Sequence, residues 1–355
     1  MIRVGVIGLG IGRSHIKGYQ DHPDAQIVAI ADLNPKALEE TGREYGIESR
    51  YTSHTEMLAK EKLDVVSIAL PNYLHKSVTL EALAAGCHVL CEKPMAMNAA
   101  EAREMLDAAR RAGKRLMINF SFRFRDQSWA LKRQIETGIL GDVYFARSVW
   151  HRRRGLPGFG GWFGQKQYSG GGALIDLGVH RLDLALWFMG YPKPSYILGS
   201  AYNPIGTARA LSEQRPFDVD DLAAACIKFE NGATLMLEAS WAANIAEKEY
   251  METRLYGTRA GLVQKNKNEG YEFEAEIFIE QAGCQFDMKL HDSIPVTQAN
   301  TAMYHFVDAI INDRPHIAAG DEGLVVMEIL DAIYESAQSG KPVDVAARRS
   351  AATAG

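Results

Sequence analysis

An aspartate and a histidine in one glycine-led segment are the pair best suited to proton transfer. The segment Gly170–His180 has the sequence GGGALIDLGVH, and Asp176 and His180 stand four positions apart. In a helix this spacing places both side chains on one face. The other positions are largely apolar, and an unsatisfied buried polar group costs roughly 1–3 kcal/mol, so the pair needs partners. Beside a cavity the carboxylate would orient the imidazole for acid–base chemistry and favour its protonated form; the alternative is a hydrogen-bonded structural pair.

A lysine follows a short predicted strand in the first third of the chain. The run His88–Cys91 indicates a strand, and Glu92-Lys93-Pro94 comes directly after it. Loops at the carboxyl ends of strands line the ligand crevice of a doubly wound sheet. Pro94 would fix the turn, and Lys93 could hydrogen-bond both a substrate oxygen and a dinucleotide ribose. The alternative is an exposed surface lysine.

Three glycines at the first strand–helix turn indicate a dinucleotide site. The turn Gly8–Arg13 has the sequence GLGIGR, between a predicted strand and a predicted helix. Glycine lets the backbone turn tightly and approach a pyrophosphate, whose charge the helix N-terminus favours. The spacing departs from G-x-G-x-x-G, because the third glycine comes one position early and Arg13 holds its usual place. The alternative is an ordinary tight turn.

An acidic residue at the end of the second predicted strand favours NAD over NADP. Asp32 lies 20 residues after Gly12, where a carboxylate can accept hydrogen bonds from the adenosine ribose. It would repel a 2′-phosphate, and Leu33-Asn34-Pro35 offers no cation to bind one.

The loop after the third predicted strand adds further candidates. Pro71 and Asn72 are expected to contact the nicotinamide-side ribose, whereas His75 could equally be a surface or N-capping residue. Trp162 and Tyr168 could stack on a sugar ring or on the nicotinamide. The predicted cofactor contacts are Gly8, Gly10, Ile11, Gly12, Arg13, Asp32, Leu33, Leu70, Pro71, Asn72, His75, Glu92, Lys93 and Trp162. No metal site is predicted.

Alternating strand and helix signals position these residues in the first 120 positions. Short apolar runs predict strands, and helical spacing predicts the segments between them. This alternation indicates a doubly wound parallel sheet with right-handed crossovers. The predicted strands are Arg3–Gly8, Gln26–Ala31, Asp64–Leu70, His88–Cys91 and Arg115–Asn119, and the predicted helices are Gly12–Gln20, Pro35–Tyr45, Lys76–Ala85 and Ala99–Arg111.

The pattern changes after Phe120. Strand signals with turn punctuation dominate from Leu222 to Leu290, and Ala173–Met189 is apolar and helical. This part is therefore predicted to be an α+β domain with a large, mostly antiparallel sheet. We expect a Rossmann domain over residues 1–122, a second domain over 123–345, and a flexible tail over 346–355; the family resemblance described below implies that the second domain binds substrate and forms oligomers through an open sheet.

Length and composition exclude several classes of protein. The 355 residues include 39 Lys+Arg and 44 Asp+Glu, a net charge of −5, with 47% hydrophobic residues. Such a chain is not disordered, and its acidic balance argues against a nucleic-acid partner. Four cysteines are too few for a disulfide framework and indicate a reducing cytoplasm. No apolar run reaches the length of a membrane span, and no secretory signal is expected.

Taken together, these motifs identify a resemblance to the Gfo/Idh/MocA oxidoreductases, the family of glucose-fructose oxidoreductase and inositol dehydrogenase. The resemblance covers almost the whole chain in the family's order. It rests on Gly8–His15, Pro71–His75, Glu92-Lys93-Pro94, Trp162, Gly170–His180 with Asp183, Leu235–Trp241 and Tyr256-Gly257-Thr258. One departure is Trp162-Phe163, where many relatives have Trp-Arg, so substrate specificity does not carry over through that loop.

The resemblance implies a Lys–Asp–His catalytic group, formed here by Lys93, Asp176 and His180. The histidine would be the general base on a substrate hydroxyl, the lysine would position that hydroxyl, and the aspartate would orient the histidine. It also implies a homodimer or homotetramer formed through the C-terminal sheet. The expected function is NAD-dependent hydride transfer to or from a secondary alcohol of a sugar, inositol or sugar derivative. The alternatives are redox-assisted glycoside cleavage and a catalytically silent nucleotide sensor.

Clues to the substrate are few. His151 and Arg152 begin a basic cluster that runs to Arg154 and would suit an acidic sugar or a sugar nucleotide, unless the loop is simply solvated. Arg123 and Tyr168 are the other candidates. We expect a small carbohydrate or polyol substrate.

Overall fold

The structure is a computed structural model that describes residues 1–291 and 301–353. It divides into two compact units. The first comprises Met1–Ser121 and Ala299–Met327, and the second Phe122–Gln298 and Glu328–Gly355. The first unit thus ends close to the predicted boundary, and it also includes a segment from late in the chain.

The first unit is built on a parallel sheet. Among the described residues the sheet has six strands in the order β3-β2-β1-β4-β5-β6, and every neighbouring pair is parallel. This confirms the predicted Rossmann-like fold. The strands are β1 (Ile2–Ile7), β2 (Ala25–Ala31), β3 (Ser49–Tyr51), β4 (Val65–Ile68), β5 (His88–Cys91) and β6 (Leu116–Ile118).

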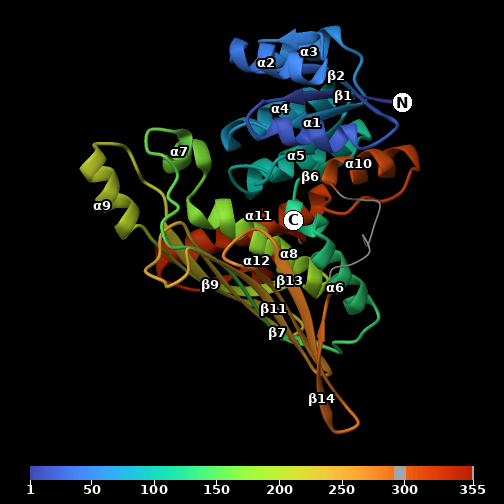
Figure 1. Ribbon diagram of the computed structural model, residues 1–355. Helices are drawn as coiled ribbons and strands as arrows, with labels where there is room; N and C mark the ends of the chain where they lie inside the picture. The colour runs from blue at the N-terminus through green and yellow to red at the C-terminus, as the bar shows by residue number, and fades with distance from the viewer. Residues whose placement is uncertain (292–300, 354–355) are drawn as a thin grey trace. The chain divides into compact units, whose positions relative to one another are not determined.

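Helices connect these strands (Figure 1). Helix α2 shows why they begin and end where they do: Asn34 accepts hydrogen bonds from the backbone of Lys36 and Ala37, and Gly46, with φ 68°, terminates the helix. The connecting helices are α1 (Gly12–Gln20), α2 (Pro35–Tyr45), α3 (His54–Lys60), α4 (Asn72–Ala84) and α5 (Ala99–Ala112), and the late segment adds α10 (Ala302–Ile311).

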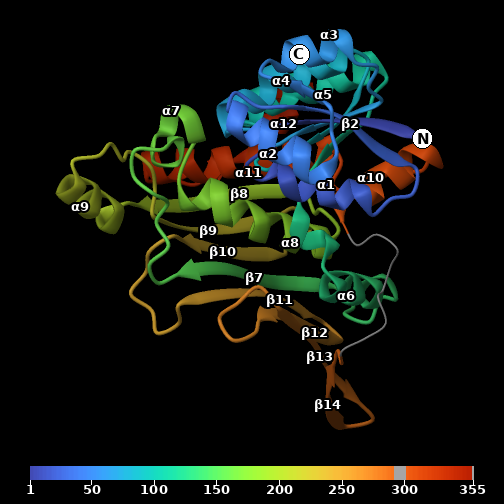
Figure 2. The ribbon, with the colours of Figure 1, turned by 45° about the horizontal axis from the view of Figure 1, so that its top comes forward.

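The second unit is built on a larger sheet, which Figure 2 shows strand by strand. Among the described residues it has nine strands in the order β14-β13-β12-β11-β7-β10-β9-β8-β15. Of the strand pairs that the structure describes in this sheet, only β7 and β10 are parallel, so the predicted, mostly antiparallel sheet is confirmed. The strands are β7 (Val143–Arg152), β8 (Pro194–Tyr202), β9 (Leu222–Phe229), β10 (Thr234–Ser240), β11 (Glu249–Gly257), β12 (Ala260–Asn266), β13 (Phe273–Gln281), β14 (Cys284–Lys289) and β15 (Val343–Asp344).

Helices cover one face of this sheet. Ser148 on β7 donates a hydrogen bond to the backbone oxygen of Arg181 on α8, so even-numbered positions of β7 lie under that helix. The odd-numbered Arg147 projects from the opposite face. The helices of this unit are α6 (Asp126–Glu136), α7 (Lys166–Ser169), α8 (Val179–Met189), α9 (Pro204–Glu213) and α12 (Val345–Thr353), and α11 (Gly320–Ser339) begins in the first unit.

Two features differ from the sequence-based expectation. Residues 346–355 were expected to form a flexible tail, but most of them belong to helix α12, which covers residues 345–353. The expected helix Ala173–Met189 begins with a π-helical turn at Leu174–Gly178 before α8. In the described part of the chain, no helix combines the length and apolar character that a membrane crossing requires.

Candidate active site

The glycine-rich turn of the first unit has the shape that a dinucleotide requires. Gly8 has a φ of +88°, and a Cβ there would lie 2.3 Å from the backbone oxygen of Ala69. A Cβ at Gly12 would lie 3.1 Å from Val6, so glycine lets α1 approach the sheet closely. A Cβ at Gly10 would meet no atom within 4 Å, which leaves open space where a pyrophosphate would lie.

Asp32 is fixed at this turn by two backbone groups. Its Oδ2 accepts a hydrogen bond from the Leu9 N–H at 2.7 Å, and its Oδ1 accepts one from the Asn34 N–H at 2.8 Å. A carboxylate oxygen has a second acceptor site, so both oxygens can still accept ribose hydroxyls. The turn and this carboxylate therefore fit NAD.

The neighbouring candidates are exposed. Leu33 is 86% exposed and Ile11 56% exposed, so each could lie against an adenosine. The guanidinium of Arg13 lies 3.4 Å from the Glu40 carboxylate on α2. That contact offsets part of the charge that Arg13 would present to a phosphate.

His75 is completely buried and lies between two loops of the site. Its Nδ1 is 2.8 Å from the Pro94 carbonyl, and its Nε2 is 2.8 Å from the Leu70 carbonyl. Burial lowers the pKa of His75, and the two carbonyl groups oppose that shift. His75 therefore joins the loop after β4 to the loop after β5, and its ring is not exposed to a cofactor. Pro71 and Asn72 begin α4 in the first of these loops.

Glu92 is also buried, beneath the lysine that follows it. Its Oε1 accepts hydrogen bonds from His15 at 2.8 Å and from Asn119 at 2.5 Å. Its Oε2 accepts the Lys93 N–H at 3.2 Å. Burial alone would raise the pKa of Glu92, but the hydrogen bond and charge of His15 lower it overall. Glu92 thus holds the backbone of Lys93, whose side chain is partly exposed and whose peptide bond to Pro94 is cis.

In the second unit, an aspartate far along the chain clamps the start of the Asp176 segment. Asp220 accepts hydrogen bonds from the Gly172 N–H at 2.7 Å and the Leu174 N–H at 2.8 Å, and Tyr334 donates to it at 2.8 Å. A Cβ at Gly172 would lie 1.8 Å from the backbone oxygen of Asp220, so the last glycine of the triplet is required by packing. Burial raises the pKa of Asp220, and its hydrogen bonds oppose that shift.

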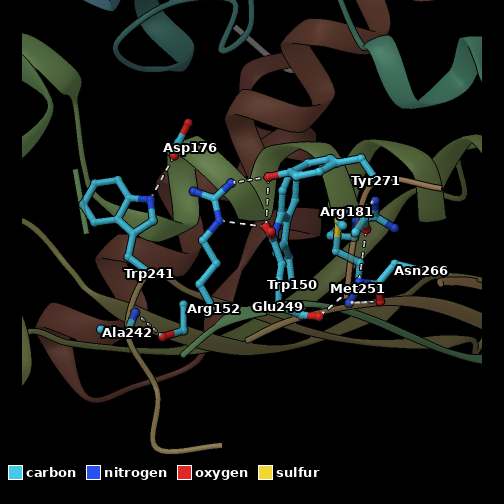
Figure 3. Close-up of polar contacts among 12 residues, drawn as sticks. Trp150, Arg152, Asp176, Arg181, Trp241, Ala242, Glu249, Met251, Asn266 and Tyr271 are labelled. Carbon is cyan, nitrogen blue, oxygen red and sulfur yellow. Dashed lines mark hydrogen bonds and ion pairs between the residues drawn. The ribbon is translucent and has the colours of Figure 1, made fainter. Parts of the chain in front are cut away.

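The clamped segment carries both residues of the predicted acid–base pair. Asp176 lies in the π-helical turn and accepts the Trp241 indole N–H at 2.9 Å, as Figure 3 shows. His180 follows in the first turn of α8. Its ring packs against Phe122 at 5.0 Å and Trp150 at 5.7 Å between centroids. Such π-helical turns are frequent at functional sites.

Arg181, the neighbour of His180, is a buried cation in an aromatic environment. Its guanidinium lies 4.4 Å from the ring of Phe122, 5.4 Å from that of Trp150 and 5.5 Å from that of Phe273. Burial lowers the pKa of Arg181 to about 9; Arg125 adds to this shift, and the charge of Glu249 opposes it. Over the described residues, no carboxylate forms a hydrogen bond or ion pair with Arg181.

The residues that the sequence predicts to contact substrate lie in different environments. Arg123 is fully buried in an ion pair with Asp183, at 2.6 and 2.9 Å, and therefore has a structural role. His151 projects from the face of the sheet opposite α8, 3.5 Å from Glu238, so it does not lie beside His180. Arg152, one position later on β7, lies on the same face as Trp150.

The aromatic candidates lie on the long loop after β7. Trp162 stacks on Phe163 with ring centroids 3.9 Å apart, and Tyr168 on α7 is partly exposed. The sequence did not identify Asp220, Trp241 or Glu249 as contacts of the site. Each of them contacts a predicted residue that lies far away along the chain. The one local signal was Trp241, in the motif Leu235–Trp241 that contributes to the family resemblance.

A Rossmann unit with a dinucleotide turn, joined to a unit that carries an Asp–His pair, defines the class of two-domain dinucleotide-dependent oxidoreductases. A model described as an oxidoreductase family with an NAD-binding Rossmann fold matches residues 2–120, and a model for the C-terminal alpha/beta domain of that family matches residues 132–345. The chain belongs to the Gfo/Idh/MocA oxidoreductase family and binds NAD.

Several relatives of the chain are named as sugar dehydrogenases. It is 33% identical over 351 residues to a D-glucoside 3-dehydrogenase of Escherichia coli strain K12, and the matched region covers 97% of each chain. It is 29% identical over 313 residues to the levoglucosan dehydrogenase of Pseudarthrobacter phenanthrenivorans, which covers 81% of this chain and 78% of the relative. A solved structure of levoglucosan dehydrogenase with NADH superposes with a TM-score of 0.85 at 26% identity, covering 97% of this chain and 99% of that one.

Proposed function

We propose that the protein is an NAD-dependent dehydrogenase that oxidises a ring secondary alcohol of a neutral pyranoside, in particular a D-glucoside. The observation that carries this proposal is the clamped segment, which holds Asp176 through Trp241 and places the ring of His180 against Phe122 and Trp150. The similarity to a D-glucoside 3-dehydrogenase over 97% of both chains supports the choice of substrate.

Each residue has a distinct part in the proposed reaction. His180 Nδ1 or Nε2 accepts the proton of the sugar hydroxyl, while Asp176 orients the ring and Trp241 holds Asp176. Lys93, fixed through Glu92, donates a hydrogen bond to the same hydroxyl oxygen. Gly8–Gly12 and Asp32 would hold NAD, which would supply the hydride acceptor when bound.

The test is to titrate the protein with NAD and NADP and then to assay methyl β-D-glucopyranoside, levoglucosan and a panel of inositols for NADH formation. We expect turnover of the glucoside with NAD, and a loss of about 10³-fold or more in kcat for His180→Ala. The matched control is His54→Ala, which removes a partly exposed imidazole paired with Glu81 in the first unit. Full activity of His180→Ala would refute the mechanism, and absence of turnover on every sugar would refute the function.

We also propose that the face of the second sheet opposite α8 forms the contact between copies of this chain in the cytoplasm. Tyr196, Leu198 and Tyr256 lie exposed on that face. Sedimentation should show a dimer or tetramer, and Leu198→Glu should dissociate it. A monomeric wild-type protein would contradict this proposal.

A further inference from the structure

A cluster of four side chains lies next to His180 in the second unit. β7 and β11 are antiparallel neighbours that pair Arg152 with Glu249 and Trp150 with Met251. Arg152 and Glu249 therefore project from the same face as Trp150, whose indole packs against His180. Tyr271, on the turn before β13, completes the cluster, and Figure 3 shows how the side chains converge.

One oxygen of Glu249 accepts three hydrogen bonds in this cluster. Its Oε1 accepts from Trp150 Nε1 at 2.7 Å, from Arg152 Nε at 2.8 Å and from the Tyr271 hydroxyl at 3.0 Å. Arg152 Nη2 in turn donates to the Tyr271 hydroxyl at 2.7 Å. This arrangement fixes the direction of the carboxylate and of the guanidinium.

Two polar atoms of this cluster take no part in these hydrogen bonds. Within the described part of the chain, neither Glu249 Oε2 nor Arg152 Nη1 has a hydrogen-bond partner, although the side chains of both residues are mostly buried. Tyr271 is 46% exposed and sits beside them. The cluster thus offers a fixed acceptor, a fixed donor and an aromatic ring.

This combination suits neighbouring hydroxyl groups of a sugar. Each hydroxyl both donates and accepts a hydrogen bond, so one can donate to Oε2 while its neighbour accepts from Nη1. The apolar ring face of the sugar can lie against Tyr271. A phosphate or a carboxylate would bring only acceptors and would face Glu249.

The charges in the cluster oppose anion binding. Glu249 and Arg152 neutralise each other, and the hydrogen bond and charge of Glu249 raise the pKa of Arg152 despite its burial. Glu249 also offsets the charge of buried Arg181. Loss of the Glu249 charge would leave both guanidinium groups uncompensated and would favour an anion.

We propose that Glu249, Arg152 and Tyr271 form the subsite that recognises the ring hydroxyls adjacent to the reacting one, and that the Glu249 carboxylate selects neutral glycosides over uronates. This inference rests on the proposed function, since it assigns the part of the sugar that does not react.

The experiment compares wild type with Glu249→Gln on methyl β-D-glucopyranoside, its 2-, 4- and 6-deoxy analogues, and methyl β-D-glucuronide. For Glu249→Gln we expect KM for the glucoside to rise about tenfold or more, with kcat within about threefold. At least one deoxy analogue should lose about tenfold in kcat/KM with wild type but not with the variant. The glucuronide-to-glucoside ratio of kcat/KM should rise about tenfold.

The matched control is Glu238→Gln. Glu238 Oε1 accepts a hydrogen bond from Nε of Arg147, another arginine of β7, at 3.0 Å, but on the opposite face of the sheet. It should keep wild-type selectivity. If Glu249→Gln fails to fold, Tyr271→Phe removes only one partly exposed hydroxyl and should raise KM about threefold.

The possible failures are distinguishable. Wild type that turns over no glycoside refutes the proposed function. Wild type that is active, with Glu249→Gln leaving KM and the glucuronide ratio within twofold, refutes the subsite alone. A fall in kcat and thermal stability at unchanged selectivity also refutes the subsite, because it shows a structural role.

Discussion

Replacing Asp32 by alanine should strongly weaken NADH binding. In the proposed complex the carboxylate accepts hydrogen bonds from two ribose hydroxyls, each worth about 1.5–3 kcal/mol when the acceptor is charged. Taking the lower value for both gives about 3 kcal/mol, which corresponds to a dissociation constant for NADH about 150-fold higher.

The same substitution should not weaken the binding of NADPH. A carboxylate about 4 Å from a 2′-phosphate repels it by roughly 4 kcal/mol per unit charge at an effective dielectric constant near 20. Asp32→Ala removes that repulsion, so NADPH affinity should not fall. The preference for NADH over NADPH should therefore shrink by at least about 100-fold.

The assay is a titration of NADH and NADPH fluorescence with Asp32→Ala and a matched control. Asp64→Ala serves as the control, because Asp64 accepts the Arg3 N–H at 2.8 Å much as Asp32 accepts the Leu9 N–H, but at the amino end of β4. It should bind NADH as wild type does. An NADH affinity of Asp32→Ala within threefold of wild type, or an unchanged preference, would refute the assignment of Asp32.

Three further substitutions test other parts of the two units. Gly172→Ala, whose Cβ would lie 1.8 Å from a backbone oxygen, should cost about 3 kcal/mol or more in urea unfolding; a wild-type midpoint would contradict this. His15 lowers the pKa of Glu92, so Glu92 stabilises the fold above its ordinary pKa of 4.5 and loses that effect as pH falls. Glu92→Gln should thus be about 3 kcal/mol less stable at pH 7, and the gap should narrow near pH 4. Trp241→Phe removes the hydrogen bond to Asp176 and should lower kcat about tenfold with NADH affinity unchanged.

NADH absorbance during turnover separates net oxidation from glycoside cleavage. If the enzyme is a dehydrogenase, NADH accumulates in step with consumption of an aryl glucoside. Release of the aglycone at a steady, low NADH level would instead support the redox-assisted cleavage that the sequence left open.

Sequence reasoning worked best where the signal was local. The strand–turn–helix order around Gly8, Gly10 and Gly12 predicted the first unit, and its parallel sheet confirms the prediction. The hairpin-rich second half likewise predicted an antiparallel sheet. In both cases residues close in the chain determine the element, so periodicity alone identifies it.

It worked less well where burial or distant partners decide the role. Arg123 looked like a substrate contact, but Asp183 neutralises it in the core. His151 and Arg152 were treated as one cluster, although neighbours on a strand point to opposite faces, and only Arg152 lies with Trp150. Glu249 lies 97 positions from Arg152 along the chain, so no local sequence pattern predicts that the two residues pair.

The Asp220 clamp separates what must stay constant in this enzyme from what can change. Asp220, Gly172 and Tyr334 secure the segment that carries Asp176 and His180, and they do so through contacts with one another. Arg152, Glu249 and Tyr271 are attached to different strands and a turn. In the proposed enzyme, a change of sugar preference at the ends of β7 and β11 would therefore leave the shape of the segment that carries Asp176 and His180 unaltered.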